Sequence, residues 1–381
     1  MNAPLLARMT GWRHRLHAAP EFGFEEHGTA AFVADTLEAL GLEVARGIGG
    51  TGVVATLRRG AGNRAIALRA DMDALRIAET PGRPHGSRSP GLMHACGHDG
   101  HVAMLLGAAH LLAAEGGFDG TVRFLFQPAE EWGRGALAML DDGLLSRFPF
   151  DEIHGLHNMP GLPIGHVATR PGALMAAEDI FEITLRGTGG HAARPDTGRE
   201  ALVAGCALVG DLQGIVSRRL SPAEAAVVSV TEFLTDGTRN VLPGTVRLLG
   251  DARSFTPAVS ARIEAEMRRL AAGTATSYAL DVTVEYRREF VPLLNDPALA
   301  QEVVAAARSL PGATVCAAAE PVCASEDFAR FLAHVPGVFT FIGNGEASAP
   351  LHNPEYDFDD RALMPGAQLL AAIARRRLAA A

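Results

Sequence analysis

Hydrophobic positions in the first third of the chain alternate between short β-type runs and longer helical periods. Clustered apolar and β-branched residues predict strands, whereas apolar residues three and four positions apart predict helices. The expected elements are a helix over residues 25–40, strands over 52–57 and 65–68, a helix over 98–114 and a strand over 121–126. Such alternation is typical of a layered α/β domain.

The middle of the chain follows a different order. The expected elements are a strand over 180–185, a helical stretch over 196–219, strands over 226–233 and 245–251, a helix over 256–271 and a strand over 282–286. This β-α-β-β-α-β order is that of a ferredoxin-like sandwich. Residues 291–297 then form a linker back to an α/β pattern, which ends in an alanine-rich helix with a basic last turn, as the helix dipole favours.

The patterns therefore predict two domains. One consists of residues 1–178 and 288–381, and the other, residues 179–287, is inserted into it. A chain of 381 residues is longer than one average domain, which agrees with this division. Hydrophobic residues make up 48% of the chain, enough to build a large core and too many for a disordered protein.

Charge and targeting signals narrow the classes of partner. The net charge of −9 gives the whole chain no attraction for nucleic acid or an anionic membrane. The longest apolar stretch, residues 102–114, is shorter than the roughly 20 residues that span a bilayer. Residues 1–17 lack the apolar segment of a signal peptide. We expect a cytoplasmic protein without nucleic-acid or membrane partners.

The four cysteines are few and irregularly spaced for a chain of this length. They are Cys96, Cys206, Cys316 and Cys323. This usage argues against a disulfide framework and favours a reducing compartment. We expect Cys206, Cys316 and Cys323 to be small buried residues.

The densest chemistry lies in one run, Met93-His94-Ala95-Cys96-Gly97-His98-Asp99-Gly100-His101. It combines a thiol, imidazoles and a carboxylate just before a predicted helix, and this mixture suits a borderline transition metal. Further candidate groups lie at Glu130-Glu131, at His157 and at His352. Because these groups come from distant segments, we expect a catalytic centre assembled by folding rather than a local zinc knuckle.

Two acidic pairs follow predicted strands. Asp71 and Asp73 follow one strand, and Glu130 and Glu131 follow another, where sites gather in open α/β sheets. On a loop, two adjacent carboxylates can point in different directions, so that one binds metal and the other takes a proton from water. The side chains that could together hold two metal ions are Cys96, His98, Glu131, His157 and His352.

These motifs resemble the metal-dependent amidohydrolases of the aminoacylase and carboxypeptidase metallopeptidase superfamily. The most similar branch holds hippurate hydrolase-like, N-acyl-amino-acid and auxin-conjugate amidohydrolases. The matching runs occur in the family's order and cover nearly the whole chain, which makes them specific together although each alone is weak. They are residues 16–26, 68–75, 93–101, 127–131, 155–158, 189–191, 240–243, 325–328 and 351–353.

The resemblance implies a zinc-peptidase-like catalytic domain with a mixed sheet flanked by helices. It also implies that residues 179–287 form a lid that can dimerise. The implied cofactors are two divalent transition-metal ions (Mn, Zn, Co or Ni), with Glu130 as general base and acid. The implied metal ligands are Cys96, His98, Glu131, His157 and His352.

The resemblance also assigns residues of the inserted domain. His191 would stabilise the oxyanion, in its own or a partner's active site. Asn240 and Arg253 lie where related proteins hold the free carboxylate of the substrate, and a guanidinium suits two carboxylate oxygens. We expect His94 and His101 to have structural or supporting roles.

The chain departs from the family pattern at several positions. Arg76 replaces the usual proline after Asp73-Ala74-Leu75, and Trp132 and Arg134 interrupt a commonly glycine-rich run. After His191, Ala192 replaces a frequent glycine, and Asp196 stands where histidine is common. None of these changes removes an implied ligand, but those beside Glu131 leave the substrate choice open.

The function that the resemblance implies is hydrolysis of the amide of an N-acyl amino acid by a homodimer or higher oligomer. One alternative is a dipeptidase or carboxypeptidase of the same superfamily. Cys96 favours the acyl-amino-acid branch, because peptidase branches usually carry aspartate there. A second alternative is a catalytically silent protein that binds acylated amino acids, against which the intact Glu130 argues.

Overall fold

The computed structural model describes residues 2–379 and divides the chain into two compact units. The first unit comprises residues 2–174, 294–320 and 327–379, and the second comprises 175–293 and 321–326. The expected boundaries, at 178/179 and 287/288, fall within strands β8 (Ala177–Arg186) and β13 (Asp281–Phe290). The second unit is longer at both ends because these strands belong to it in full.

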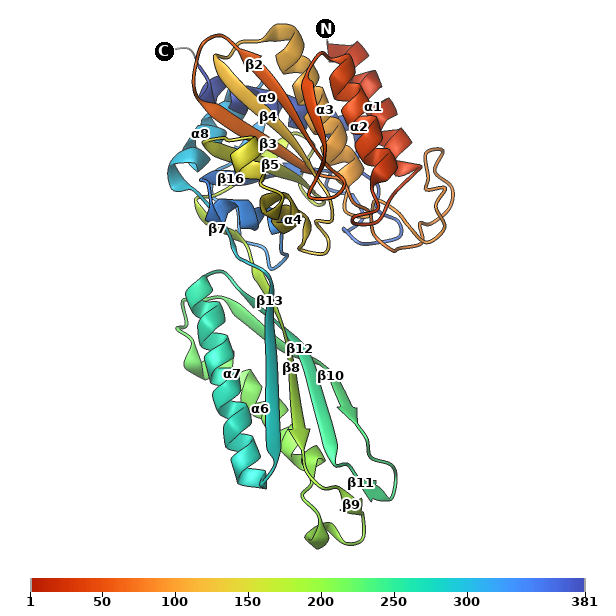
Figure 1. The fold of residues 1–381 in the computed structure, drawn as a ribbon, viewed down its shortest axis with the longest axis vertical. Coiled ribbons are helices and arrows are strands. Elements are labelled where there is room, and N and C mark those ends of the chain that lie inside the picture. The colour runs from red at the N-terminus through yellow and green to blue at the C-terminus, as the bar shows by residue number, and fades with distance from the viewer. Residues whose placement is uncertain (1, 380–381) are drawn as a thin grey trace. The chain divides into compact units, whose positions relative to one another are not determined.

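A mixed eight-stranded sheet forms the centre of the first unit (Figure 1). Its strand order is β1-β2-β4-β3-β5-β16-β6-β15. Strands β3, β4, β5 and β16 run parallel to one another, so their carboxyl ends lie at one edge. The bounds are β1 Glu43–Ile48, β2 Gly52–Arg59, β3 Ala65–Asp71, β4 Gly120–Gln127, β5 Glu152–Met159, β6 His166–Ala168, β15 Thr314–Cys316 and β16 Gly337–Gly343.

Helices bury the faces of this sheet. Helix α3 is apolar around nearly its whole circumference, which fits its position between the sheet and the outer helices. Residues of α1, α2, α3 and α9 share one hydrophobic core with β2, β3 and β4, and α8 packs with α9 in a second cluster. The bounds are α1 Asn2–His17, α2 His27–Ala39, α3 His98–Glu115, α4 Gly135–Asp141, α5 Leu144–Arg147, α8 Pro297–Arg308 and α9 Leu363–Arg377.

The second unit has the predicted β-α-β-β-α-β order. Its antiparallel sheet has the order β10-β12-β8-β13, and α6 and α7 share a hydrophobic core with it (Figure 1). This is the topology of a ferredoxin-like sandwich. A short separate pair, β9 and β11, extends beyond one end of the sheet. The remaining bounds are β9 Gly190–His191, α6 Ala201–Arg219, β10 Ala226–Thr235, β11 Val241–Leu242, β12 Thr245–Ser254 and α7 Pro257–Tyr278.

Several expectations differ from the structure. The predicted helix over 196–219 is interrupted, because Gly198 is extended between a 3-10 turn (Pro195–Thr197) and α6. Strands β1, β5 and β16 and helix α1 were not expected. The apolar residues of β1, β5 and α1 are mixed with charged or polar ones, whereas β16 is a buried β-type run that could have been predicted. The expectation of three buried cysteines is wrong: Cys206 and Cys323 are exposed and Cys316 is half-buried.

Helix α6 differs from the other helices of the described part of the chain in its exposed apolar surface. It alone among them is long and apolar enough to cross a membrane, and 33% of this stretch is buried in the fold. Its buried residues, which include Leu208, Leu212 and Ile215, pack into the core of the second unit. Length and composition alone do not place a helix in a bilayer, and a covering protein surface would satisfy the same apolar face.

The close packing of α3 and α9 gives a test of the fold. A β-carbon on Gly366 would overlap the side chain of Met104, so Gly366→Ala should lower the free energy of unfolding by about 1–3 kcal/mol. Gly11→Ala is the matched control, because its β-carbon would meet nothing within 4 Å and should stabilise α1 by about 0.5–1 kcal/mol. Urea unfolding followed by circular dichroism measures both, and an unchanged midpoint for Gly366→Ala would contradict the packing.

Candidate metal centre

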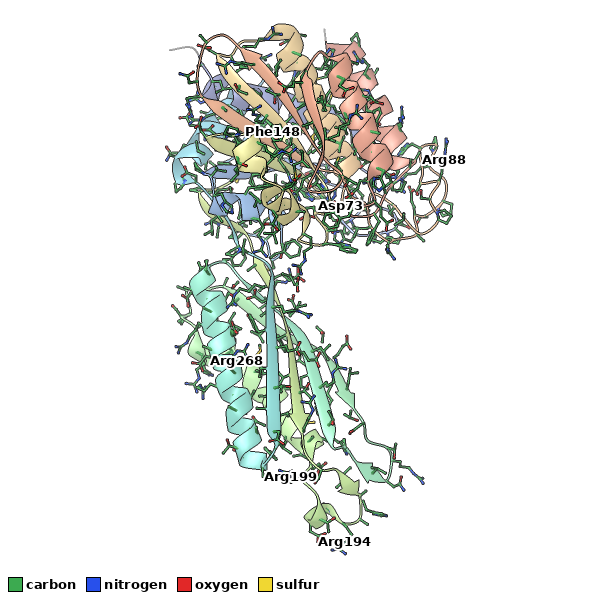
Figure 2. The ribbon with its side chains drawn as sticks, in the orientation of Figure 1. Asp73, Arg88, Phe148, Arg194, Arg199 and Arg268 are labelled. Carbon is green, nitrogen blue, oxygen red and sulfur yellow. The ribbon has the colours of Figure 1, made fainter. Side chains whose placement is uncertain are left out.

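The five predicted ligands converge at the carboxyl edge of the parallel strands. Glu131 follows β4, His157 lies near the end of β5, and Cys96 and His98 stand at the start of α3. His352 joins them from a later loop, because its backbone N–H donates to the carbonyl of Ala95 at 2.9 Å. Figure 2 labels Asp73 among the loops at this edge.

The donor atoms of these residues have the spacing of a coordination shell. Cys96 Sγ lies 3.3 Å from His157 Nε2. Glu131 Oε1 lies 3.8 Å from His98 Nε2 and 3.5 Å from His352 Nε2. Ligands bonded to one tetrahedral ion are separated by roughly 3.3–3.8 Å. The donors form two groups that share Cys96, one with His98 and His157 and the other with Glu131 and His352.

Hydrogen bonds turn the histidines toward this centre. His98 Nδ1 donates to the carbonyl and carboxylate of Asp73, at 2.9 and 3.1 Å, and His157 Nδ1 donates to the carbonyl of Asn158 at 2.6 Å. Each bond leaves Nε2 as the free nitrogen, as is usual for metal-binding histidines. His98 Nε2 and Glu131 Oε1 are buried and make no hydrogen bond, so these atoms lack a partner that a cation would supply.

The electrostatics of the centre also fit a cation. Burial lowers the pKa of His98, but the carboxylates of Asp71 and Asp73 outweigh it and raise this pKa to about 10. Burial also raises the pKa of the Cys96 thiol well above its usual range, and the charge of Glu131 raises it further. His98 and Cys96 thus hold their protons strongly where a metal ion could replace them, whereas burial lowers the pKa of His157 well below its usual value and leaves that ring neutral for metal binding. The thiol, imidazole and carboxylate donors therefore fit divalent transition metals.

Glu130 lies beside this donor set in a position suited to proton transfer. It is only 6% exposed, and its Oε1 accepts a hydrogen bond from the backbone N–H of Asp327 at 3.2 Å. Ala129, just before it, has a positive φ of 46°, an uncommon conformation for a residue with a β-carbon. Glu130 and Glu131 both lie close to His98, so this turn brings the two adjacent carboxylates to the same centre.

A buried network that the sequence did not single out supports the centre. Arg69 donates to Asp71 at 2.8 Å and to Asp327 at 3.1 Å. The Arg69 guanidinium therefore bonds both Asp71, which lies beside the histidines, and Asp327, whose backbone N–H donates to Glu130. The signal for this network is a charged residue, Arg69, within the otherwise apolar strand β3.

The two other histidines of the motif differ in their contacts. His101 is engaged on both ring nitrogens, by Asp71 Oδ1 at 2.6 Å and by the backbone N–H of Asn158 at 3.0 Å. Asn158 in turn donates to the carbonyl of Cys96 at 2.6 Å, which ties β5 to the start of α3. His94 is buried, its ring nitrogens make no hydrogen bond to the described residues, and burial lowers its pKa to about 4.

A glycine is required where α3 begins. Gly97, between the two candidate ligands Cys96 and His98, has a φ of 90°. A β-carbon there would overlap the side chains of Asn158 and Tyr356. Only glycine combines a positive φ with the absence of a β-carbon. Gly97 therefore allows a sharp turn with a candidate ligand on each side of it.

His191 and Asn240 lie together in the second unit. Strand β9, which ends at His191, pairs with β11, and the N–H of Ala192 donates to the carbonyl of Asn240 at 3.1 Å. His191 Nδ1 accepts from the N–H of Ala193 at 3.0 Å, so the exposed Nε2 carries the hydrogen of the neutral ring. Figure 2 shows Arg194 near the tip of this loop.

Arg253 lies at the opposite end of the same sheet. It pairs with Glu178 at 3.1 Å and Asp251 at 2.8 Å and donates to Ser325 Oγ at 2.8 Å. Strand β12, which separates it from the Asn240 loop, spans roughly 26–30 Å at 3.3 Å per residue. Asn240 and Arg253 of one chain are therefore too far apart to bind one small carboxylate, and the predicted pair would need a residue from each of two chains.

Comparison with known proteins places the chain in a family. Residues 67–376 match the model of peptidase family M20/M25/M40. The chain is 37% identical over 372 residues to the N-acetyl-L-cysteine deacetylase of Bacillus subtilis strain 168, covering 97% of this chain and 88% of that protein. It is also 37% identical over 372 residues to the hippurate hydrolase of Campylobacter jejuni, covering 96% and 95%.

A solved structure agrees with these relatives. A dinuclear metal binding peptidase of the M20 family from Bacillus subtilis superimposes with a TM-score of 0.89 at 32% identity and covers 99% of both chains. The family model covers residues 67–376, and the relatives and this structure match nearly the whole of the chain, so each of them includes every segment of the donor cluster. The chain belongs to peptidase family M20/M25/M40, a family of metal-dependent hydrolases.

Proposed function

We propose that this protein hydrolyses the amide bond of N-acyl amino acids with two divalent metal ions. The observation that carries the proposal is the pair of donor groups that share Cys96, with Glu130 beside them. Relatives named hippurate hydrolase and N-acetyl-L-cysteine deacetylase support this substrate class. Cys96, His98, Glu131, His157 and His352 would hold the metals.

In the proposed reaction, water adds to the amide carbonyl carbon and the C–N bond breaks, giving a carboxylic acid and a free amino acid. The bound metals would polarise the carbonyl and acidify the water. Glu130 accepts the proton of the water and delivers it to the leaving nitrogen. His191 Nε2–H donates to the developing oxyanion, and a neutral ring with its hydrogen on Nε2 suits this task.

The second unit has surfaces suited to joining two chains, which supports a dimer. Strand β10 is one of the two edges of its sheet, with β13 at the other, and can pair with another strand. Val227 and Leu234 on this strand and Val203 on α6 are exposed, at 39%, 42% and 50%. A dimer through this unit would cover these apolar groups and allow Asn240 of one chain and Arg253 of the other to serve one carboxylate.

A peptidase of the same family is the alternative function, because the solved structure described above is named a peptidase. The two substrate classes differ at the group before the scissile bond, since a dipeptide carries a free ammonium where an N-acyl amino acid carries none. A site for the ammonium would need an unpaired carboxylate near the donor cluster. Asp71 and Asp73 there are both bonded to histidines, which favours the acyl substrate.

Metal removal and a substrate panel test the reaction class. Apo enzyme should be inactive on acetyl and benzoyl amino acids, and Mn²⁺, Zn²⁺ or Co²⁺ should restore release of the free amine, measured with a primary-amine reagent. A matched set of dipeptides is the comparison. Faster release from dipeptides would favour the peptidase, and no release from either set with any metal would refute the hydrolase.

Glu130→Ala tests the proton-transfer role. Loss of the proton acceptor should lower kcat by about 10²- to 10⁴-fold. Metal content measured by mass spectrometry should stay near normal, because Glu130 belongs to neither of the two donor groups that share Cys96 and accepts a backbone N–H instead. Glu131→Ala is the matched control, which should lose metal together with activity. Loss of metal from the Glu130 variant would overturn the assignment.

Leu234→Glu tests the dimer. A charge on the open edge of β10 should convert a dimer to a monomer in light scattering, and should lower activity because the predicted carboxylate pair is separated. Tyr278→Glu is the control, since Tyr278 is similarly exposed at 38% but lies at the end of α7 rather than on the edge strand. A wild-type monomer with full activity would contradict the proposed assembly.

A further inference from the structure

Two of the departures from the family pattern meet on one aromatic ring. The ring of Trp132 packs edge-to-face against Phe22, with centroids 5.0 Å apart and planes at 73°. The guanidinium of Arg76 lies over the same Phe22 ring, 4.1 Å from its centroid. Arg76 stands where the family usually has proline, and Trp132 stands within a commonly glycine-rich run. Neither proline nor glycine could build this arrangement.

This aromatic cluster of Phe22, Arg76 and Trp132 is attached directly to the metal centre. Phe22 forms a β-bridge with Ala74, the residue after Asp73. The same Asp73 bonds His98 through Oδ1 and accepts the N–H of Glu131 through Oδ2 at 3.0 Å. Trp132 follows Glu131 in the chain. Trp132 is therefore adjacent to one candidate metal ligand, Glu131, and Phe22 is bridged to the residue after Asp73, which bonds a second candidate, His98.

The cluster presents groups that lack partners within the fold. Trp132 is 47% exposed, more than any other aromatic side chain among the exposed large hydrophobic residues. Arg76 is exposed, and among the described residues its guanidinium contacts the Phe22 ring and no carboxylate. Arg253, by contrast, is already paired with two carboxylates. Arg76 is therefore the better placed of the two to attract an additional anion.

We propose that Phe22, Arg76 and Trp132 form the subsite for the acyl group, and that it selects an aromatic ring carrying a carboxylate. The indole offers a wall against which a planar ring can stack, and the guanidinium offers paired donors to the carboxylate. Phe22 holds both groups in place and is itself covered. This inference rests on the proposed hydrolase function and specifies its substrate class as N-aroyl amino acids with an acidic aroyl group.

Three substrates of one amino acid test the subsite, namely its N-acetyl, N-benzoyl and N-(4-carboxybenzoyl) derivatives. In the wild type, kcat/KM should rise in that order. Trp132→Leu should reduce the benzoyl-to-acetyl ratio roughly 3- to 10-fold, chiefly through KM, and Trp132→Phe should restore most of it because a ring is present again. Arg76→Gln should reduce the carboxybenzoyl-to-benzoyl ratio roughly 10-fold or more.

Arg8→Gln is the matched control. Arg8 also lies over a tryptophan, Trp12, at 5.3 Å from the ring centroid, but this pair is on α1. Its loss should leave both substrate ratios unchanged. Metal content is measured for every variant, so that a loss of metal near Glu131 is recognised. Unchanged ratios in the Trp132 and Arg76 variants, with metal retained and acetyl substrates still hydrolysed, would overturn the subsite and leave the hydrolase function standing.

A binding measurement separates the two proposals if no substrate is hydrolysed. The chain has two tryptophans, so Trp12→Phe leaves Trp132 as the only indole reporter. N-(4-carboxybenzoyl)glycine should change its fluorescence, and Arg76→Gln in the same background should weaken this binding roughly 10-fold. Such a result with no turnover would support the subsite while refuting the hydrolase. No fluorescence change at millimolar ligand would overturn the subsite.

Discussion

The structure depends on one electrostatic constraint: buried donor atoms at one site that make no hydrogen bond to any described residue. His98 and Glu131 present unbonded atoms to the same small volume, and Cys96 is buried with them. Burying polar and charged groups without partners costs several kcal/mol, so a fold keeps such a cluster only when something compensates it. A divalent cation compensates the thiolate and the carboxylate together. The surrounding network can then be understood as the support that keeps these donors from collapsing onto one another.

In this supporting network, positively and negatively charged side chains alternate. The guanidinium of Arg69 lies between the carboxylates of Asp71 and Asp327, and Asp71 in turn bonds His101. Each group is neutralised on more than one side, which makes the network rigid and costly to rearrange. Because Asp327 also holds Glu130 through its N–H, one connected set of bonds positions both the histidines and Glu130. Under the proposed mechanism, this network fixes the proton-transfer group relative to the donors.

The sequence allowed much of this to be predicted, for identifiable reasons. The start of α3 could be predicted from a short local motif, in which Cys96, Gly97 and His98 form one turn. The β-α-β-β-α-β order of the second unit could be predicted from hydrophobic periodicity. The support network is different: Arg69 is marked as a charged residue in an otherwise apolar strand, but its partner Asp327 is 258 residues away and nothing local links the two. Pairing across such separations depends on strand order, and β16 and β5, which set that order here, were not expected. The resemblance assigned Asn240 and Arg253 to one carboxylate, and only the structure shows that the extended strand β12 separates them within one chain.

The contrast between this buried network and the residues around it explains where substrate specificity can vary. Apart from His352, which is exposed on a later loop, and Glu131, which is half-buried, the donors and their support are buried, so a change at one of them disturbs several bonds at once. Phe22, Arg76 and Trp132 lie just outside this network, on segments joined to it by a backbone bridge and by chain continuity. Substitution there alters the surface offered to a substrate while Asp73 continues to hold His98 and Glu131. A hydrolytic centre can therefore be kept constant while its substrate class changes, and this chain departs from its family at positions where such change disturbs the centre least.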